Sequence, residues 1–167
     1  DVDKPAMAAQ LMTHNTTVAF RAFSLGILGA APAALPLVMT GLQVGALTVE
    51  QEKAGNSLWF WSFLAPHAVP ELTAIFIAAG AGMLVGRSLI APGERTRRDA
   101  LKLAGGEAIR MVLGTIAMFI FAGLTESFIS PSPLPPWAKF AFLGLMAVLL
   151  TLYLRLGKPQ PAPETIQ

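Results

Sequence analysis

The chain alternates long apolar segments with short polar connections. Four of the apolar segments hold 20 residues or more and contain few charges. A helix rises about 1.5 Å per residue, so each is long enough to cross a hydrocarbon layer of about 30 Å. The predicted spans are 17–39, 70–91, 107–129 and 137–156.

Two further apolar segments, 41–49 and 58–65, are too short to cross a membrane alone. A polar stretch separates them, and Pro66 follows the second. We therefore expect a re-entrant pair of half-length helices, which survives at membrane depth when protein or water surrounds its backbone. The alternative is that the first two apolar segments divide into two tilted helices.

Composition supports a membrane protein. Hydrophobic residues make up 54% of the 167 positions and charged residues only 13%, against about a quarter in soluble domains. The predicted fold class is all-α: a polytopic transmembrane helical bundle of about four full spans plus two half-length re-entrant helices. We expect residues 1–16 to form a cytoplasmic flank with further residues upstream, 17–156 the bundle, and 157–167 a disordered proline-rich tail.

Basic residues predict the orientation of the bundle. The connection after the second span holds Arg95, Arg97, Arg98 and Lys102, and short basic loops stay cytoplasmic. The uncharged loop 130–136 then faces outward. Thr96 and Asp99 resemble a helix cap, and Gly105–Gly106 would end a short surface helix there. Because topology explains this cluster, nucleic acid is not an expected partner.

Small residues at helical spacing predict close helix packing. Gly41 and Gly45 form one such pair. Ala78, Gly82 and Gly86 share a face with Glu71, so that face should meet another helix.

His67, Glu71 and Glu126 are the candidate functional cluster, expected at one outer level of the bundle. One interpretation is that the cluster binds a divalent metal that activates water. This interpretation is weakened because Pro70 should begin the helix and leave His67 outside it. His14, the only other histidine, is expected on the opposite side. A second interpretation is a proton or ion relay. The third is structural, with each polar group satisfied by neighbours. Of these we favour the structural one, and predict no metal and no cofactor.

Cysteine is absent, which excludes a disulfide framework, a thiolate zinc site and a cysteine nucleophile. The serines lie in no nucleophile motif. The sequence therefore predicts no catalytic residues.

Four stretches together resemble the stage II sporulation protein M family of bacterial membrane proteins. They are HNTTVAFRAFSLGI (14–27), PHAVPELTAIFIAAGAG (66–82), PGERTRRDALKLAG (92–105) and ESFISPSPLP (126–135). The chain departs from the usual family pattern at His14, where Asn is common, and at Ala68, where Gly is common.

The resemblance implies a multi-pass, all-helical protein of the bacterial cytoplasmic (inner) membrane. In spore-formers such a protein anchors a complex that remodels peptidoglycan, with hydrolases as separate partners; relatives elsewhere are often encoded beside MoxR-type ATPases. We therefore expect a non-enzymatic scaffold. Its expected partners are the lipid bilayer, other membrane or envelope proteins such as those hydrolases or that ATPase, and a second copy of the chain. The alternatives are a transporter or channel using the His/Glu cluster and an intramembrane metallohydrolase.

Overall fold

The computed structural model describes the backbone over residues 4–156 and side chains over 13–155. In this part of the chain all regular elements are helices and there is no strand, which confirms the all-α class. The elements are α1 (Lys4–Gly26), α2 (Ala30–Lys53), α3 (Ser57–Ile90), α4 (Arg97–Leu124), the π-helical turn η1 (Thr125–Ile129) and α5 (Pro136–Leu156).

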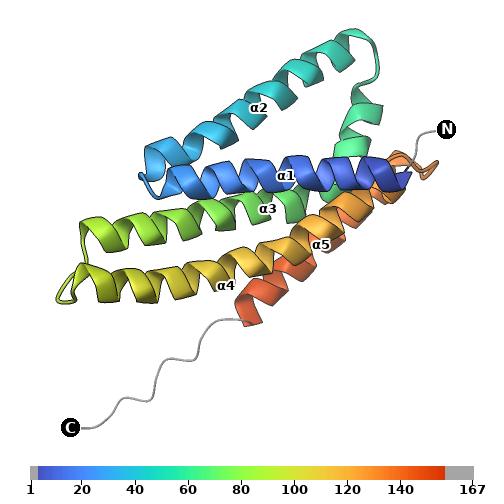
Figure 1. Cartoon of the computed structure of the whole chain (residues 1–167). Coiled ribbons are helices and arrows are strands. Elements are labelled where there is room, and N and C mark those ends of the chain that lie inside the picture. Colours follow the sequence, from blue (N-terminus) through green and yellow to red (C-terminus); the bar gives the residue numbers. More distant parts are fainter. Residues whose placement is uncertain (1–3, 157–167) are drawn as a thin grey trace.

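Four helices in this region are long and apolar enough to cross a membrane: α2, α3, α4 continued through η1, and α5. The number of spans agrees with the prediction, and the chain is a multi-pass membrane protein. Successive helices run in opposite directions, so α1 and α3 are parallel (Figure 1). The basic connection between α3 and α4 lies at one end, and the connection between α4 and α5 lies at the other.

The predicted span 17–39 was wrong, because the chain turns within it. α1 ends at Gly26, and α2 begins at Ala30 after Gly29, whose φ of 128° favours glycine. The apolar run continues through this turn, so hydropathy alone does not reveal it. The alternative of two helices is the one that the structure shows, and α1 itself is not among the four candidate spans.

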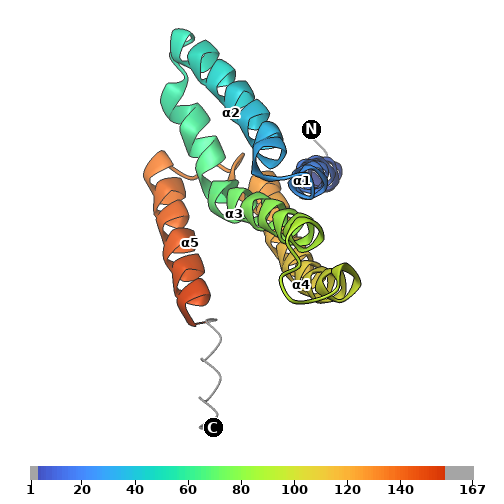
Figure 2. The ribbon, with the colours of Figure 1, turned by 90° about the vertical axis from the view of Figure 1, so that its left-hand side faces the viewer.

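The predicted re-entrant pair was also wrong. Residues 41–49 are the second half of α2, and 58–65 are the first turns of α3. Pro66 and Pro70 lie inside α3 and do not end it. Each lacks the N–H that would bond to the carbonyl four residues earlier, which explains why the first turns of α3 run in a different direction from the rest (Figures 1 and 2).

The start of α4 confirms one prediction and corrects another. Thr96 Oγ1 accepts a hydrogen bond from the Asp99 backbone N–H at 3.2 Å and donates one to Asp99 Oδ2 at 2.7 Å. This is the predicted cap. However, the helix does not stop at Gly105–Gly106, and 28 residues form one continuous α4. A Cβ added at either glycine would have nothing within 4 Å, so close packing does not require glycine at these two positions.

Small residues hold α1 against α3, as predicted for the face that contains Ala78, Gly82 and Gly86. A Cβ added at Gly82 would collide with the carbonyl oxygen of Phe23, and one at Gly86 with that of Ile27. Gly26 makes the reciprocal approach from α1 to Ala79. The backbones therefore lie in direct contact, which a larger side chain would prevent.

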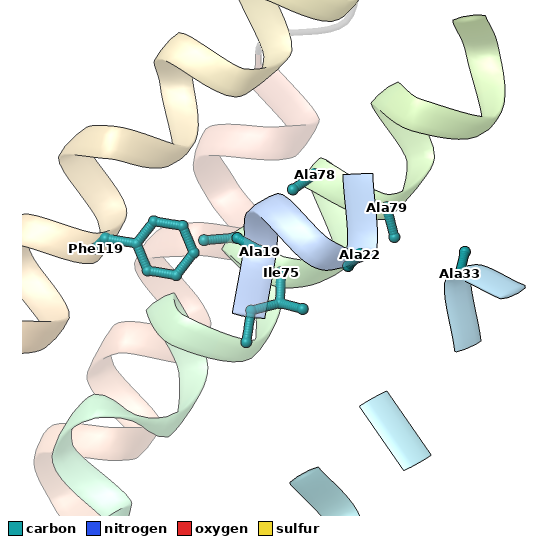
Figure 3. Close-up of a cluster of buried hydrophobic side chains, with 8 residues drawn as sticks. Ala19, Ala22, Ala33, Ile75, Ala78, Ala79 and Phe119 are labelled. Carbon is teal, nitrogen blue, oxygen red and sulfur yellow. The ribbon is translucent and has the colours of Figure 1, made fainter. Parts of the chain in front are cut away.

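The apolar core lies where α1, α3 and α4 meet. Figure 3 shows the Phe119 ring of α4 pointing toward Ala19 of α1, with Ile75 of α3 beside them. The core is built mostly from alanine, which lets the three helices approach closely. Its buried members are Ala19, Ala22, Ala33, Ala74, Ile75, Ala78, Ala79 and Phe119.

Helices α2 and α5 form the rim of the molecule, on either side of α3 (Figure 2). Only 6% of the most apolar window of each is buried within the molecule, against 39% for α3 and 33% for the span that contains α4. The prediction that Gly41 and Gly45 pack against a helix is not met within the chain, because an added Cβ would have nothing within 4 Å at either position. Both face outward from α2.

Orientation gives a first testable prediction. The chain has no cysteine, so single cysteines report accessibility without background. Because the basic connection should be cytoplasmic, Glu94→Cys should react with a membrane-impermeant maleimide only after the membrane is opened. Asn56→Cys and Leu134→Cys, at the other end, should react in intact cells. If Glu94→Cys is labelled in intact cells and the other two variants are not, the orientation is the opposite of the predicted one.

This arrangement is incompatible with a cytoplasmic flank at residues 1–16 if the basic connection is also cytoplasmic. The described part of that flank belongs to α1, which starts at the end opposite the basic connection (Figure 1). The expectation rested on a single span over 17–39, whereas the chain reverses direction at Gly29, between α1 and α2 (Figure 1).

Candidate functional site

The structure brings the three predicted polar residues together. His67 Nε2 lies 3.9 Å from Glu71 Oε2 and 3.8 Å from Glu126 Oε1. One donor atom from each side chain fits within 4.8 Å of the others. The side chains are only 8%, 17% and 12% exposed, respectively, so the cluster is a largely buried polar site.

Helix α3 supplies two of the three residues. His67 and Glu71 are one turn apart on the same face, because α3 continues through both prolines. We expected Pro70 to begin the helix and leave His67 outside it, and that expectation was wrong. The objection to a regular His–Glu pair therefore does not hold.

The π turn η1 supplies the third residue, Glu126. Its widened geometry is marked by the hydrogen bond from the Ser130 N–H to the Thr125 carbonyl, 2.9 Å, which spans five residues. Such turns inside helices occur frequently at functional sites. No residue type in TESFI signals a π turn, so sequence reasoning placed Glu126 correctly but did not predict the turn.

Three residues that sequence reasoning missed surround the cluster. Ser130 Oγ lies 3.3 Å from His67 Nδ1, and its carbonyl oxygen accepts a hydrogen bond of 2.6 Å from Lys139 Nζ of α5. The Asn15 side chain of α1 lies close to the Glu71 carboxylate. All three are buried. Lys139 was visible in the sequence as a charge just inside an apolar segment, whereas Asn15 and Ser130 carried no signal beyond lying in the stretches that carry the family resemblance.

The position of Asn15 also corrects the expectation for His14. That residue was placed on the opposite side of the membrane from the cluster, but its neighbour Asn15 lies close to Glu71. His14 therefore lies at the level of the cluster, with its own side chain exposed on the outer face of α1.

Glu126 Oε2 is buried and has no hydrogen-bond partner among the described residues, and the same holds for Ser127 Oγ, the next residue of η1. Buried polar atoms are nearly always paired, so unpaired ones indicate a missing ligand, a water molecule or a proton. A histidine and two carboxylates can hold a cation or pass a proton.

A second feature is an apolar groove between α1 and α4, with a volume of about 680 Å³. Phe20 of α1, Ala78 of α3 and Ile116 of α4 are among its lining residues. None of His67, Glu71 and Glu126 lines it. The groove and the polar cluster are therefore separate features.

The predicted basic residues gather at the other end of the molecule. Arg95 lies in the connection before α4, and Arg97, Arg98 and Lys102 lie in its first turns. All four are exposed. They take no part in the polar cluster.

Comparison with known proteins places the chain in a family. The sequence model of the family described as Stage II sporulation protein M matches residues 1–131, which include α1 to η1 and all three cluster residues. No curated protein and no solved structure matched the chain. Because the match covers most of the chain, this protein belongs to the stage II sporulation protein M family.

Proposed function

We propose that this protein is a non-enzymatic membrane scaffold that anchors or recruits cell-envelope proteins, with peptidoglycan hydrolases as the partner class. The family supports a membrane protein of this kind. The observation that carries the proposal is the exposed surface of α1 from residue 13 onward, where polar side chains predominate beside the exposed Phe20 although α1 packs among the membrane-spanning helices.

The exposed side of α1 is poorly suited to lipid. His14, Thr16, Thr17 and Arg21 are all exposed there, and α1 is not among the helices apolar enough to span alone. Polar side chains that face hydrocarbon are costly, whereas a neighbouring protein can offer hydrogen-bond partners. Arg21, near the end of α1, can reach the headgroups. Thr17 already donates its hydroxyl to the Thr13 carbonyl oxygen, so His14 and Thr16 are the positions that favour a protein neighbour.

The apolar groove between α1 and α4, next to this surface, is where such a neighbour can bind. It combines the apolar side chains of α4, such as Ile116, with Thr16 and Thr17 of α1. An apolar helix that carries a few hydroxyl or amide groups would complement both walls. We therefore propose that a partner's transmembrane segment occupies it.

Photocrosslinking in bacterial membranes tests this. A photoreactive residue at Phe20 or Ile116 should capture one discrete envelope protein, identified by mass spectrometry. The same group at Leu145, on the exposed side of α5, should capture lipid only. Thr17→Trp fills the groove and should abolish the Phe20 crosslink without changing the elution volume of the purified protein. Lipid adducts alone at Phe20 and Ile116 would refute the scaffold.

The two alternative functions make different predictions. A transporter that uses the cluster predicts substrate-dependent flux in liposomes, lost in Glu71→Gln. A metallohydrolase predicts hydrolytic activity that chelators remove. If either result is obtained and no protein crosslinks to the groove, the corresponding alternative function replaces the scaffold function.

A further inference from the structure

The separations within the polar cluster do not fit direct hydrogen bonds. Hydrogen bonds between nitrogen and oxygen measure about 2.7–3.2 Å, whereas His67 Nε2 is 3.9 Å and 3.8 Å from the two carboxylates. Two ligand atoms on one tetrahedral zinc ion, with bonds of about 2.1 Å, lie about 3.4 Å apart. A contraction of about 0.4–0.5 Å would bring the two His67–carboxylate separations to metal-binding distance. The two carboxylates lie within 4.8 Å of each other and would have to approach by up to about 1.4 Å.

The charges also favour a cation. Two carboxylates converge here, and within the described part of the chain neither is ion-paired to a lysine or an arginine. Lys139, which is close by, directs Nζ to the Ser130 carbonyl oxygen. Buried carboxylates need a positive partner or a proton.

The surroundings orient the donors as they are oriented in metal sites. Ser130 Oγ lies beside His67 Nδ1, which leaves Nε2 directed to the carboxylates. The Asn15 side chain lies close to the Glu71 carboxylate. In metal centres the second histidine nitrogen and the ligating carboxylates are commonly hydrogen-bonded in this way. Glu126 adds an independent observation, because its Oε2 is buried, has no partner in the described region and is therefore free to bind a cation.

We propose that His67, Glu71 and Glu126 bind one divalent transition-metal cation, with Zn²⁺ as the preferred ion. Imidazole selects such ions over Mg²⁺, and the two carboxylates would balance the charge. Three protein donors leave a coordination position for water. The ion would join α3 to η1. This site goes beyond the scaffold function and does not depend on it.

Metal titration of the full chain in nanodiscs tests the site. After chelator treatment, the wild type should bind one Zn²⁺ per chain and should not bind Mg²⁺ under the same conditions. His67→Gln and Glu126→Gln should each weaken Zn²⁺ binding at least tenfold. Ser130→Ala, which removes only the group beside Nδ1, should weaken it about tenfold.

His14→Gln is the matched control, because it removes the other histidine from an exposed position at the same level. It should bind Zn²⁺ like the wild type. A wild type that binds no Zn²⁺, or equal loss in His14→Gln and His67→Gln, would overturn the site. If His67→Gln does not fold, Co²⁺ bound to the wild type provides a second readout: the visible spectrum of nitrogen and oxygen ligation should appear, and its absence refutes the proposal. Crosslinking through the groove is unaffected by either outcome.

Discussion

Replacing Gly82 with alanine is expected to be the most damaging small substitution in the molecule. The new Cβ would meet the carbonyl oxygen of Phe23, which belongs to the backbone and cannot rotate away. Helices α1 and α3 must then separate, at an expected cost of about 3 kcal/mol, at the upper end for overpacked sites. Thermal unfolding in detergent, followed by circular dichroism, measures the loss.

Gly45→Ala provides the matched control. This glycine lies in a helix too, but its added Cβ would have nothing within 4 Å. Because alanine favours helix over glycine by about 1 kcal/mol, Gly45→Ala should leave the protein as stable as the wild type or slightly more stable. Equal effects of the two substitutions would show that the α1–α3 contact is not limited by glycine.

Lys139→Met is expected to have the second largest effect. Lys139 Nζ is buried and donates to the Ser130 carbonyl oxygen, directly after η1, where carbonyl groups have no helical partner. Methionine has similar length but no donor and no charge. The loss should cost about 1–3 kcal/mol, the usual penalty for a buried acceptor left unpaired. Thermal unfolding of the purified protein measures it.

Lys102→Met is the control, since Lys102 is exposed in the first turns of α4. It should melt close to the wild type. If Lys139→Met also unfolds close to the wild-type temperature, the hydrogen bond to Ser130 does not contribute to holding α5 and η1 together.

Much of the fold could be predicted because hydropathy follows the requirements of the bilayer. The all-helical class, the number of spans, the approximate positions of the last three and the small face around Gly82 all appear as patterns in the sequence. The predictions failed where backbone conformation, not polarity, decides the outcome. Gly29 turns the chain inside an unbroken apolar run, whereas Pro66 and Pro70, which suggested a helix start, only bend α3.

The polar cluster, like the fold, was predicted only in part. Its three residues were predicted from their chemistry and level in the membrane, and the structure places them together. Its neighbours could not be predicted, because they depend on packing between distant helices. Asn15 reaches Glu71 only because α1 is parallel to α3, and Ser130 reaches His67 only after the π turn. Neither arrangement has a signature in a single sequence.

The unequal burial of the helices has a consequence for assembly. The pair α1–α3 is fixed by backbone contact, while α2 and α5 share little surface with the rest. A neighbour that joins at the groove or the rim displaces only lipid and leaves the central pair undisturbed. Mild detergent is therefore expected to remove such neighbours while the protein keeps its native fold. The oligomeric state of the protein purified in micelles would then not report the complexes that it forms in the membrane.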